Sequence, residues 1–240
     1  MSGGGTVSNP CLVTSWTTLD AVRNGLTSNY ALDNNLSAST GDYSGLGDTW
    51  IPIGDYYSPP DSTFTGSFDG RGHAVSNLIV DTNGNDYGGL FGVVGTGGTV
   101  YNINVDAASV TGASDVGGLA GYVEGGIINN SFSNGDISGN GEVGGLVGYA
   151  VYSTIDNSYA TGTVSGGSGN EVGGLVGGMG TSSVFNSHAT ATVVTSGDYV
   201  SGLVGYVYGA STVDNSYSIA DVNGHNSVGG LVGETYNIQH

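Results

Sequence analysis

The 240-residue sequence contains no lysine, and its positive charge is limited to Arg23 and Arg71. With 20 acidic residues, the formal net charge is −18 at pH 7. Nucleic acids and anionic membranes are bound by clusters of Lys and Arg side chains. The composition therefore excludes both as partners, and it favours solubility in salty surroundings and the binding of cations.

Cysteine and long apolar runs are equally scarce. The single cysteine, Cys11, excludes an intramolecular disulfide and a cysteine-rich metal site. No segment supplies the ~20 consecutive apolar residues of a membrane-spanning helix, so we expect no membrane insertion. The opening residues, MSGGGTVSNP, lack the charged and apolar regions of a secretory signal, so an exported protein would use a removed signal or another route.

Glycine is abundant, with 47 residues, and the pentad GGLVG or a close variant recurs six times. Successive leucines of the pentads are 29, 27, 29, 28 and 28 residues apart: Leu90, Leu119, Leu146, Leu175, Leu203 and Leu231. A second column keeps the same period: Asn102, Asn130, Asn157, Asn186 and Asn215. Two columns with one period indicate stacked units, none of which buries its apolar face alone.

The segment after each asparagine alternates as a β-strand does. In residues 158–164 the small or apolar set is Ser158, Ala160, Gly162 and Val164, and the larger, polar set is Tyr159, Thr161 and Thr163. The same alternation in residues 103–108 predicts that Ala108 points outward. A propeller blade needs about 40 residues, so a period near 28 favours a β-solenoid coil of two or three strands.

Stacking of the coils makes two further predictions. The pentad leucines should form one buried column, with glycines permitting tight corners and close backbone approach. The asparagine column should lie at a corner, where each amide bonds to its neighbours one coil away. The simpler alternative is that asparagine merely tolerates a left-handed turn.

These residues resemble a known family. Segment 143–166, VGGLVGYAVYSTIDNSYATGTVSG, is similar to the GLUG repeat of bacterial surface and secreted proteins, including regions of some immunoglobulin A proteases. Segment 64–80, FTGSFDGRGHAVSNLIV, resembles the stretch that leads into such repeats. The resemblance implies an all-β fold, a right-handed parallel β-solenoid of about five to seven coils. It also implies an extracellular or cell-surface location, and it implies no reaction.

We expect one continuous domain. Its parts are an N-terminal extension at 1–11, a capping helix with lead-in coils at 12–86, and the repeats at 87–240. The helix is predicted from SWTTLDAVRNGL, whose apolar residues share one helical face: Trp16, Leu19, Val22 and Leu26. Such a helix would cover the open edge of the first coil.

Acidic residues precede four of the pentads: Asp86, Asp115, Glu142 and Glu171. Asp198 is displaced from the fifth by one position. Like charges stacked at the ~4.8 Å strand spacing repel by roughly 1 kcal/mol per pair in water. The column predicts either Ca²⁺ binding through hard oxygen ligands or a solvated acidic edge with counterions. We expect no cofactor unless this column binds Ca²⁺.

Aromatic residues form an outward column after the asparagines: Phe132, Tyr159, His188 and Tyr217. A shorter column follows the pentads: Tyr122, Tyr149 and Tyr206. Stacked rings stabilise neighbouring strands by about 0.5–1.5 kcal/mol per pair. Exposed rings among Thr, Ser and Asn also suit a sugar or a partner protein, so a structural ladder and a binding face are both open.

The sequence favours a non-catalytic protein over an enzyme. Its one group of polar residues of catalytic type, Asp69, Arg71 and His73, lies in a predicted tight turn of the lead-in. Two functions remain. The first is an extracellular module for adhesion to a surface glycan or protein, which the capping helix favours. The second is a structural subunit of a fibre or stalk built by self-association, which the uncapped residues after the last pentad favour.

Overall fold

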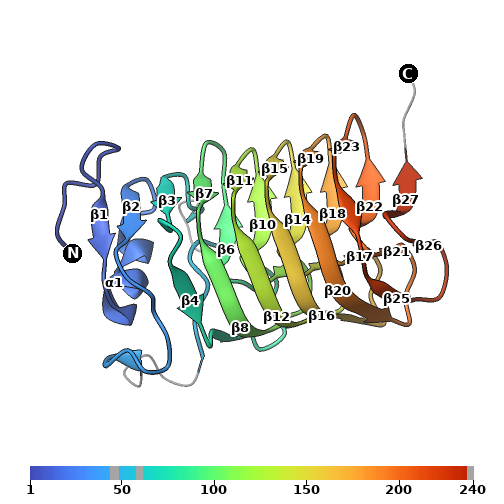
Figure 1. Cartoon of the computed structure of the whole chain (residues 1–240), viewed down its shortest axis with the longest axis horizontal. Coiled ribbons are helices and arrows are strands. Elements are labelled where there is room, and N and C mark those ends of the chain that lie inside the picture. Colours follow the sequence, from blue (N-terminus) through green and yellow to red (C-terminus); the bar gives the residue numbers. More distant parts are fainter. Residues whose placement is uncertain (44–48, 58–61, 237–240) are drawn as a thin grey trace.

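The chain forms a β-solenoid in which parallel strands of successive coils lie side by side along one long axis (Figure 1). The computed structural model describes all residues except 44–48, 58–61 and 237–240. Within the repeats, about six coils each contribute one strand to the second sheet. Ser67 of the lead-in pairs directly with Thr99 of the repeats, so the two predicted parts share one continuous sheet.

Four sheets wall the solenoid, and the strands of each are named in their spatial order. The first holds β1 (Cys11–Val13), β2 (Asn29–Leu32), β3 (Ser67–Asp69), β7 (Thr99–Tyr101), β11 (Ile127–Asn129), β15 (Thr154–Asp156), β19 (Ser183–Phe185) and β23 (Thr212–Asp214). The second holds β6 (Phe91–Val94), β10 (Ala120–Glu124), β14 (Val147–Val151), β18 (Val176–Gly180), β22 (Val204–Tyr208) and β27 (Val232–Tyr236).

The other two sheets complete each coil. The third holds β4 (Ala74–Ser76), β8 (Asn104–Thr111), β12 (Phe132–Ser138), β16 (Tyr159–Gly167), β20 (His188–Thr195) and β24 (Tyr217–Ser218), with β5 (Ile79–Asp81) beside β8 and β25 (Asp221–Asn223) beside β20. The fourth holds β9 (Val116–Gly117), β13 (Val143–Gly144), β17 (Val172–Gly173), β21 (Val200–Ser201) and β26 (Val228–Gly229).

The pentad leucines fill the interior of the solenoid. Five of them are fully buried, which confirms the predicted column: Leu90, Leu119, Leu146, Leu175 and Leu203. Leu231 is 39% exposed because it lies in the last coil, beyond which no strand of the described chain stacks. Burial of a leucine thus requires a coil on each side.

The last glycine of each pentad packs against a corner of the coil before it. A Cβ atom at Gly148 would lie 2.4 Å from the backbone nitrogen of Val116, and one at Gly177 would lie 2.5 Å from that of Val143. No side chain fits in such a space, so glycine is required for the coils to approach this closely.

The strands of the third sheet alternate as predicted, with one exception. In β20 the residues pointing inward are Ala189, Ala191 and Val193. In β8 the register against β12 shifts after Ser133, so that Gly135 pairs with Ala108. The prediction that Ala108 points outward is wrong, because the extra residue of a bulge turns the next side chain to the other face. Ala108 is buried.

The predicted helix lies at the N-terminal end of the stack (Figure 1). Helix α1 (Trp16–Asp20) begins with a capping box between Ser15 and Thr18 and continues as a 3₁₀ helix, η1 (Ala21–Asn24). Its predicted apolar face is buried at Trp16, Leu19 and Val22. No helix among the described residues is long and apolar enough to cross a membrane.

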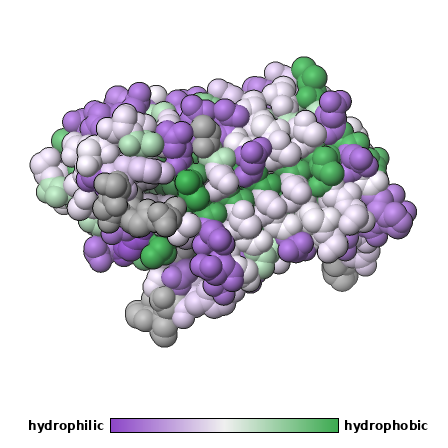
Figure 2. Space-filling view, turned by 90° about the horizontal axis from the view of Figure 1, so that it is seen from below, coloured by the Kyte–Doolittle hydropathy of each residue, from purple (hydrophilic) through white to green (hydrophobic). Residues whose placement is uncertain are grey.

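The repeat also organises the surface. Figure 2 shows apolar residues gathered in a band along the long axis, on the face seen from below. A band with this direction is expected when each coil places the same residue type at the same position.

Candidate functional site

The asparagine column lies at one corner of the coils: Asn102, Asn130, Asn157, Asn186 and Asn215. All five have left-handed backbone φ angles, between 45° and 56°. Asn130 Nδ2 donates to Asn102 Oδ1 at 2.7 Å, and Asn215 Nδ2 donates to Asn186 Oδ1 at 3.1 Å. Between these steps the Asp156 carboxylate accepts from Asn157 and Asn186, at 3.0 and 2.9 Å. The amide ladder is therefore interrupted, and the left-handed turn is what every coil shares.

The continuous ladder at this corner belongs to the serines that follow four of the five asparagines: Ser131, Ser158, Ser187 and Ser216. Ser158 Oγ accepts from the Ser131 backbone N–H at 3.2 Å and donates to the Asp156 carbonyl at 2.8 Å. Ser187 and Ser216 accept in the same way from the coil before them, each at 3.1 Å. Sequence reasoning missed this role, although the signal is present in the repeated Asn-Ser pairs at 130–131, 157–158, 186–187 and 215–216.

Ser158→Ala should lower the free energy of unfolding by about 1–3 kcal/mol. The substitution removes the acceptor of the buried Ser131 N–H, and an unsatisfied buried donor costs about that much. Urea denaturation measures the effect. Ser109→Ala is the matched control, because Ser109 is exposed and its loss should change stability by less than about 0.5 kcal/mol. Equal stability of the two variants would show that the ladder adds nothing.

The predicted aromatic column forms one stack on the outer side of the third sheet, which we name the aromatic stripe: Phe132, Tyr159, His188 and Tyr217. Neighbouring ring centroids are 4.8–4.9 Å apart, with interplanar angles of 4–8°. The rings therefore cover one another's faces and turn their edges outward. Sugars stack on open ring faces, so this geometry favours a structural ladder. Burial lowers the pKa of His188, so its ring is neutral at neutral pH.

Three of the predicted acidic residues occupy equivalent corner positions: Asp115, Glu142 and Glu171. The Val116 N–H donates to the Glu142 carbonyl at 2.9 Å, and the Val143 N–H donates to the Glu171 carbonyl at 3.1 Å. We name these three residues the acidic row.

Asp86 lies one position outside the acidic row, contrary to the prediction. Gly88 forms a β-bridge with Val116, 28 residues later, whereas Phe91 pairs with Ala120, 29 residues later. The register between the two coils therefore shifts by one residue. An alignment of the two coils on Leu90 and Leu119 therefore misaligns the residues before Gly88 by one position. Tyr87, and not Asp86, is equivalent to Asp115.

The acidic row is poorly neutralised. Burial raises the pKa of Asp115 to about 8, and the charges of Glu142, Asp86 and Glu171 add to the effect. Burial likewise raises the pKa of Glu171 to about 7, with a contribution from Glu142. Among the residues that the structure describes, no three His, Cys, Asp or Glu side chains are placed to hold a metal ion together.

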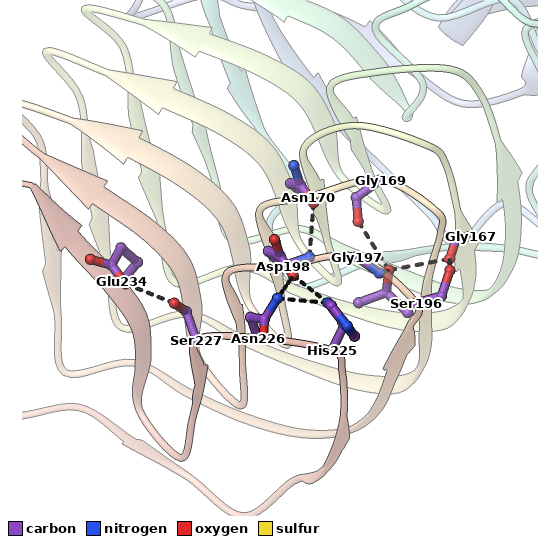
Figure 3. A network of polar contacts seen from close by, with 11 residues as sticks. Gly167, Gly169, Asn170, Ser196, Gly197, Asp198, His225, Asn226, Ser227 and Glu234 are labelled. Atoms are coloured by element: carbon purple, nitrogen blue, oxygen red, sulfur yellow. Dashed lines mark hydrogen bonds and ion pairs between the residues drawn. The ribbon is translucent and has the colours of Figure 1, made fainter.

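Asp198 belongs to a separate polar network on the exposed corner of the last coils (Figure 3). Its Oδ1 lies 3.0 Å from His225 Nδ1 and accepts from Asn226 Nδ2 at 2.9 Å. Its backbone N–H donates to Asn170 Oδ1 at 2.8 Å. The hydrogen bond with His225 lowers the pKa of Asp198, so this carboxylate is ionised and already partnered.

A larger aromatic surface covers the outer side of the second sheet. Eight of the 15 tyrosines form one connected network, which we name the tyrosine face: Tyr56, Tyr57, Tyr87, Tyr122, Tyr149, Tyr199, Tyr206 and Tyr208. Neighbouring centroids are 5.3–6.4 Å apart. Most of these pairs are tilted or edge-on, as Tyr56 and Tyr122 are at 70°. The tyrosine face is therefore not one continuous stack, unlike the aromatic stripe; Tyr149 stacks on Tyr122 and Tyr208, whereas Tyr57 is 64% exposed.

Two glycines of β18 make the tyrosine face continuous. A Cβ atom at Gly180 would lie 2.1 Å from the Tyr208 ring, and one at Gly178 would lie 2.5 Å from Glu171 Oε2. Because this strand presents no side chain outward, Tyr208 lies across it and stacks on Tyr149, with centroids 6.4 Å apart. The tyrosines on either side of β18 thus join into one surface.

Carboxylates lie among these rings. Tyr57 Oη donates to Asp86 Oδ2 at 2.8 Å, and Tyr56 Oη donates to Glu124. The bond to Asp86 raises the pKa of Tyr57 to about 12, so the hydroxyl stays protonated as a donor. Beside Tyr57 and Asp86 opens a cavity of about 560 Å³, which Trp50 also lines.

Sequence reasoning found only Tyr122, Tyr149 and Tyr206 of this surface. Tyr56 and Tyr57 come from the irregular lead-in, where no repeat marks their position. Tyr208 lies two residues after Tyr206 in β22, so alternation already places it on the same face, but its contact with Tyr149 across β18 does not follow from that alternation.

Comparison with known proteins identifies the repeat. Residues 112–138 and 139–165 match the GLUG motif. The chain carries GLUG repeats. Halomucin of Haloquadratum walsbyi is 38% identical over 132 residues, which are 53% of this chain and 1% of halomucin. The "Putative Gly-rich membrane protein" of Evansella cellulosilytica is 38% identical over 140 residues, 55% of this chain and 15% of that protein. The GLUG-repeat chain thus spans a small part of either relative.

The fold is shared with a solved structure. The "putative immunoglobulin A1 protease" from Bacteroides ovatus superposes with a TM-score of 0.66, covering 96% of the GLUG-repeat chain and 86% of its own. The two sequences are 21% identical. At this level the likeness shows a common β-solenoid and nothing of the activity.

Proposed function

We propose that this GLUG-repeat solenoid is a non-catalytic module outside the cell that attaches to a partner surface through its tyrosine face. The observation that carries the proposal is the connected network of eight partly exposed tyrosines, four from strands of the second sheet and four from neighbouring loops. Tyrosine supplies large contact area at little cost in side-chain entropy, and it is enriched at binding surfaces. The membrane protein among the relatives supports a location at the cell surface.

The aromatic stripe is the weaker candidate for attachment. Its inner rings, Tyr159 and His188, are covered on both faces by their neighbours. Its regular stacking favours the second candidate function, a structural subunit of a fibre or stalk, because stacked rings stiffen the solenoid along its axis.

Loss of rings from the tyrosine face should weaken attachment while the fold persists. Tyr122→Ala with Tyr149→Ala should weaken retention by at least about tenfold, because it opens the middle of the ring network. The assay is retention of the purified chain on immobilised polysaccharides and on basic, neutral and acidic proteins, beside a thermal melt.

The matched control removes two rings from the other surface. Tyr159→Ala with Tyr217→Ala should remain folded, since each ring pair stabilises by only about 0.5–1.5 kcal/mol, and should bind as the parent does. Loss of retention in this variant alone would move the site to the aromatic stripe. A parent chain that binds nothing in the panel would contradict a binding module and favour the structural subunit.

A further inference from the structure

The tyrosine face combines ring faces with negative charge. Asp86 and Glu124 are hydrogen-bonded to Tyr57 and Tyr56, at two points of the network. Glu171 extends over Gly178, and its charge adds to the burial and the contact with Tyr208 that raise the pKa of Tyr149. Carboxylates therefore stand next to tyrosine rings along the face.

No lysine or arginine of the chain neutralises this surface. Arg71 Nη1 pairs with Asp33 at 2.9 Å. Arg23 pairs with Asp20 at 2.7 Å and lies over the Trp50 ring at 5.0 Å. These are the only two such residues in the sequence, which has no lysine. The charge on the tyrosine face can be balanced only from outside the chain.

We propose that the tyrosine face binds arginine side chains of a partner protein segment. A guanidinium is planar, stacks on aromatic faces and forms paired hydrogen bonds with a carboxylate. The tyrosine face offers both contacts at adjacent positions, as at Tyr57 and Asp86. Each Asp86 oxygen accepts one hydrogen bond, from Tyr57 or from the Ser114 N–H, and retains a further lone pair for a guanidinium. A lysine ammonium offers a point charge without the planar stack.

The chain already contains one example of this mode of contact. Arg23 lies over Trp50, donates to the carbonyls of Ile51 and Pro52, and pairs with Asp20. A single guanidinium thus lies over an aromatic ring, donates to two backbone carbonyls and pairs with a carboxylate. The acidic row agrees, because burial first and the neighbouring carboxylates second raise the pKa values of Asp115 and Glu171, and a bound cation would favour their ionised forms.

The inference rests on the proposed function, and a defined probe tests it. A labelled peptide of four Arg-Ser repeats is titrated with the chain at about 0.15 M NaCl, where long-range attraction is screened. Fluorescence anisotropy reports binding. Peptides with lysine or with citrulline at the arginine positions keep the length, and citrulline keeps the shape without the charge. We expect the arginine peptide to bind at least about tenfold tighter than the citrulline peptide, with lysine between them.

Two matched pairs of variants separate this surface from general charge. The variants are compared at about pH 8.5, above the raised pKa values of Asp115 and Glu171, where both carboxylates carry charge. There Asp115→Asn with Glu171→Gln should weaken arginine binding at least about tenfold, and asparagine suits the left-handed backbone of residue 115, where φ is 52°. Asp136→Asn with Asp221→Asn removes the same charge from exposed positions of the third sheet and should leave affinity within about twofold. Tyr122→Ala with Tyr149→Ala should also weaken binding of the arginine peptide.

Three results would overturn the inference. Equal loss in the two charge pairs would mean that net charge alone attracts the peptide. Equal affinity for arginine and citrulline peptides, lost on removing Tyr122 and Tyr149, would leave a binding tyrosine face that does not select cations. Arginine binding unchanged by the tyrosine variant would remove this surface from both proposals.

Discussion

Leu175→Ala should lower the free energy of unfolding by about 2–5 kcal/mol, the usual cost of emptying a filled core position. Leu175 is fully buried in the middle of the column, with leucines of the coils before and after it. The interior of a solenoid is narrow, and each coil is held by its hydrogen bonds to two neighbours, so the cavity cannot readily collapse. Urea denaturation followed by circular dichroism measures the loss.

Leu231→Ala is the natural comparison for this variant. The chemical change is the same, but Leu231 is 39% exposed in the last coil. Its loss should cost well under half as much as that of Leu175, because less apolar surface leaves a packed environment. Equal costs at the two positions would contradict a column whose members are buried by stacking.

Stability should fall as pH rises from about 4 to about 8. Burial raises the pKa of Asp115 from 3.8 to about 8 and that of Glu171 from 4.5 to about 7. The folded chain therefore binds more protons than the unfolded chain in this window, and each proton lost on raising the pH weakens the fold. The fall should exceed about 1.4 kcal/mol, the free energy of one pKa unit. Urea midpoints at pH 5 and pH 8.5 measure it.

The two pairs of charge variants show which carboxylates cause this pH dependence. Asp115→Asn with Glu171→Gln should flatten the profile, whereas Asp136→Asn with Asp221→Asn should leave its slope unchanged. Added NaCl should stabilise the parent at pH 8.5 by screening repulsion. A gain with millimolar Ca²⁺ beyond that at equal ionic strength would show a metal site. A profile that rises with pH would contradict the raised pKa values.

The sequence was sufficient for the features that follow from the period alone, although it did not reveal the serine ladder. The period of about 28 residues aligns Leu119, Leu146 and Leu175, and burial of that column follows from stacking alone. The helix face of Trp16, Leu19 and Val22 could be predicted for the same reason, since local periodicity determines which side is apolar. In both cases the same residue type returns at a fixed spacing, from coil to coil in the solenoid and from turn to turn in the helix.

Features that break the repeat could not be predicted in this way. Ala108 is buried because a bulge shifts the register by one residue, and Asp86 is displaced by a similar shift near Gly88. Neither shift leaves a gap in the sequence pattern. The tyrosine face depends on Tyr208 crossing the bare strand at Gly180, a contact between coils that no single strand encodes.

The regular register has a consequence for how such a chain changes over generations. Tyr122 pairs with Tyr149, which pairs with Gly178, so each coil presents the same edge to the next. Recombination between two repeats in the gene would add or remove a whole coil, changing the length of the solenoid by about 4.8 Å without a new loop or a new core. The number of binding positions would then increase with the number of coils, and avidity would change with each coil gained or lost.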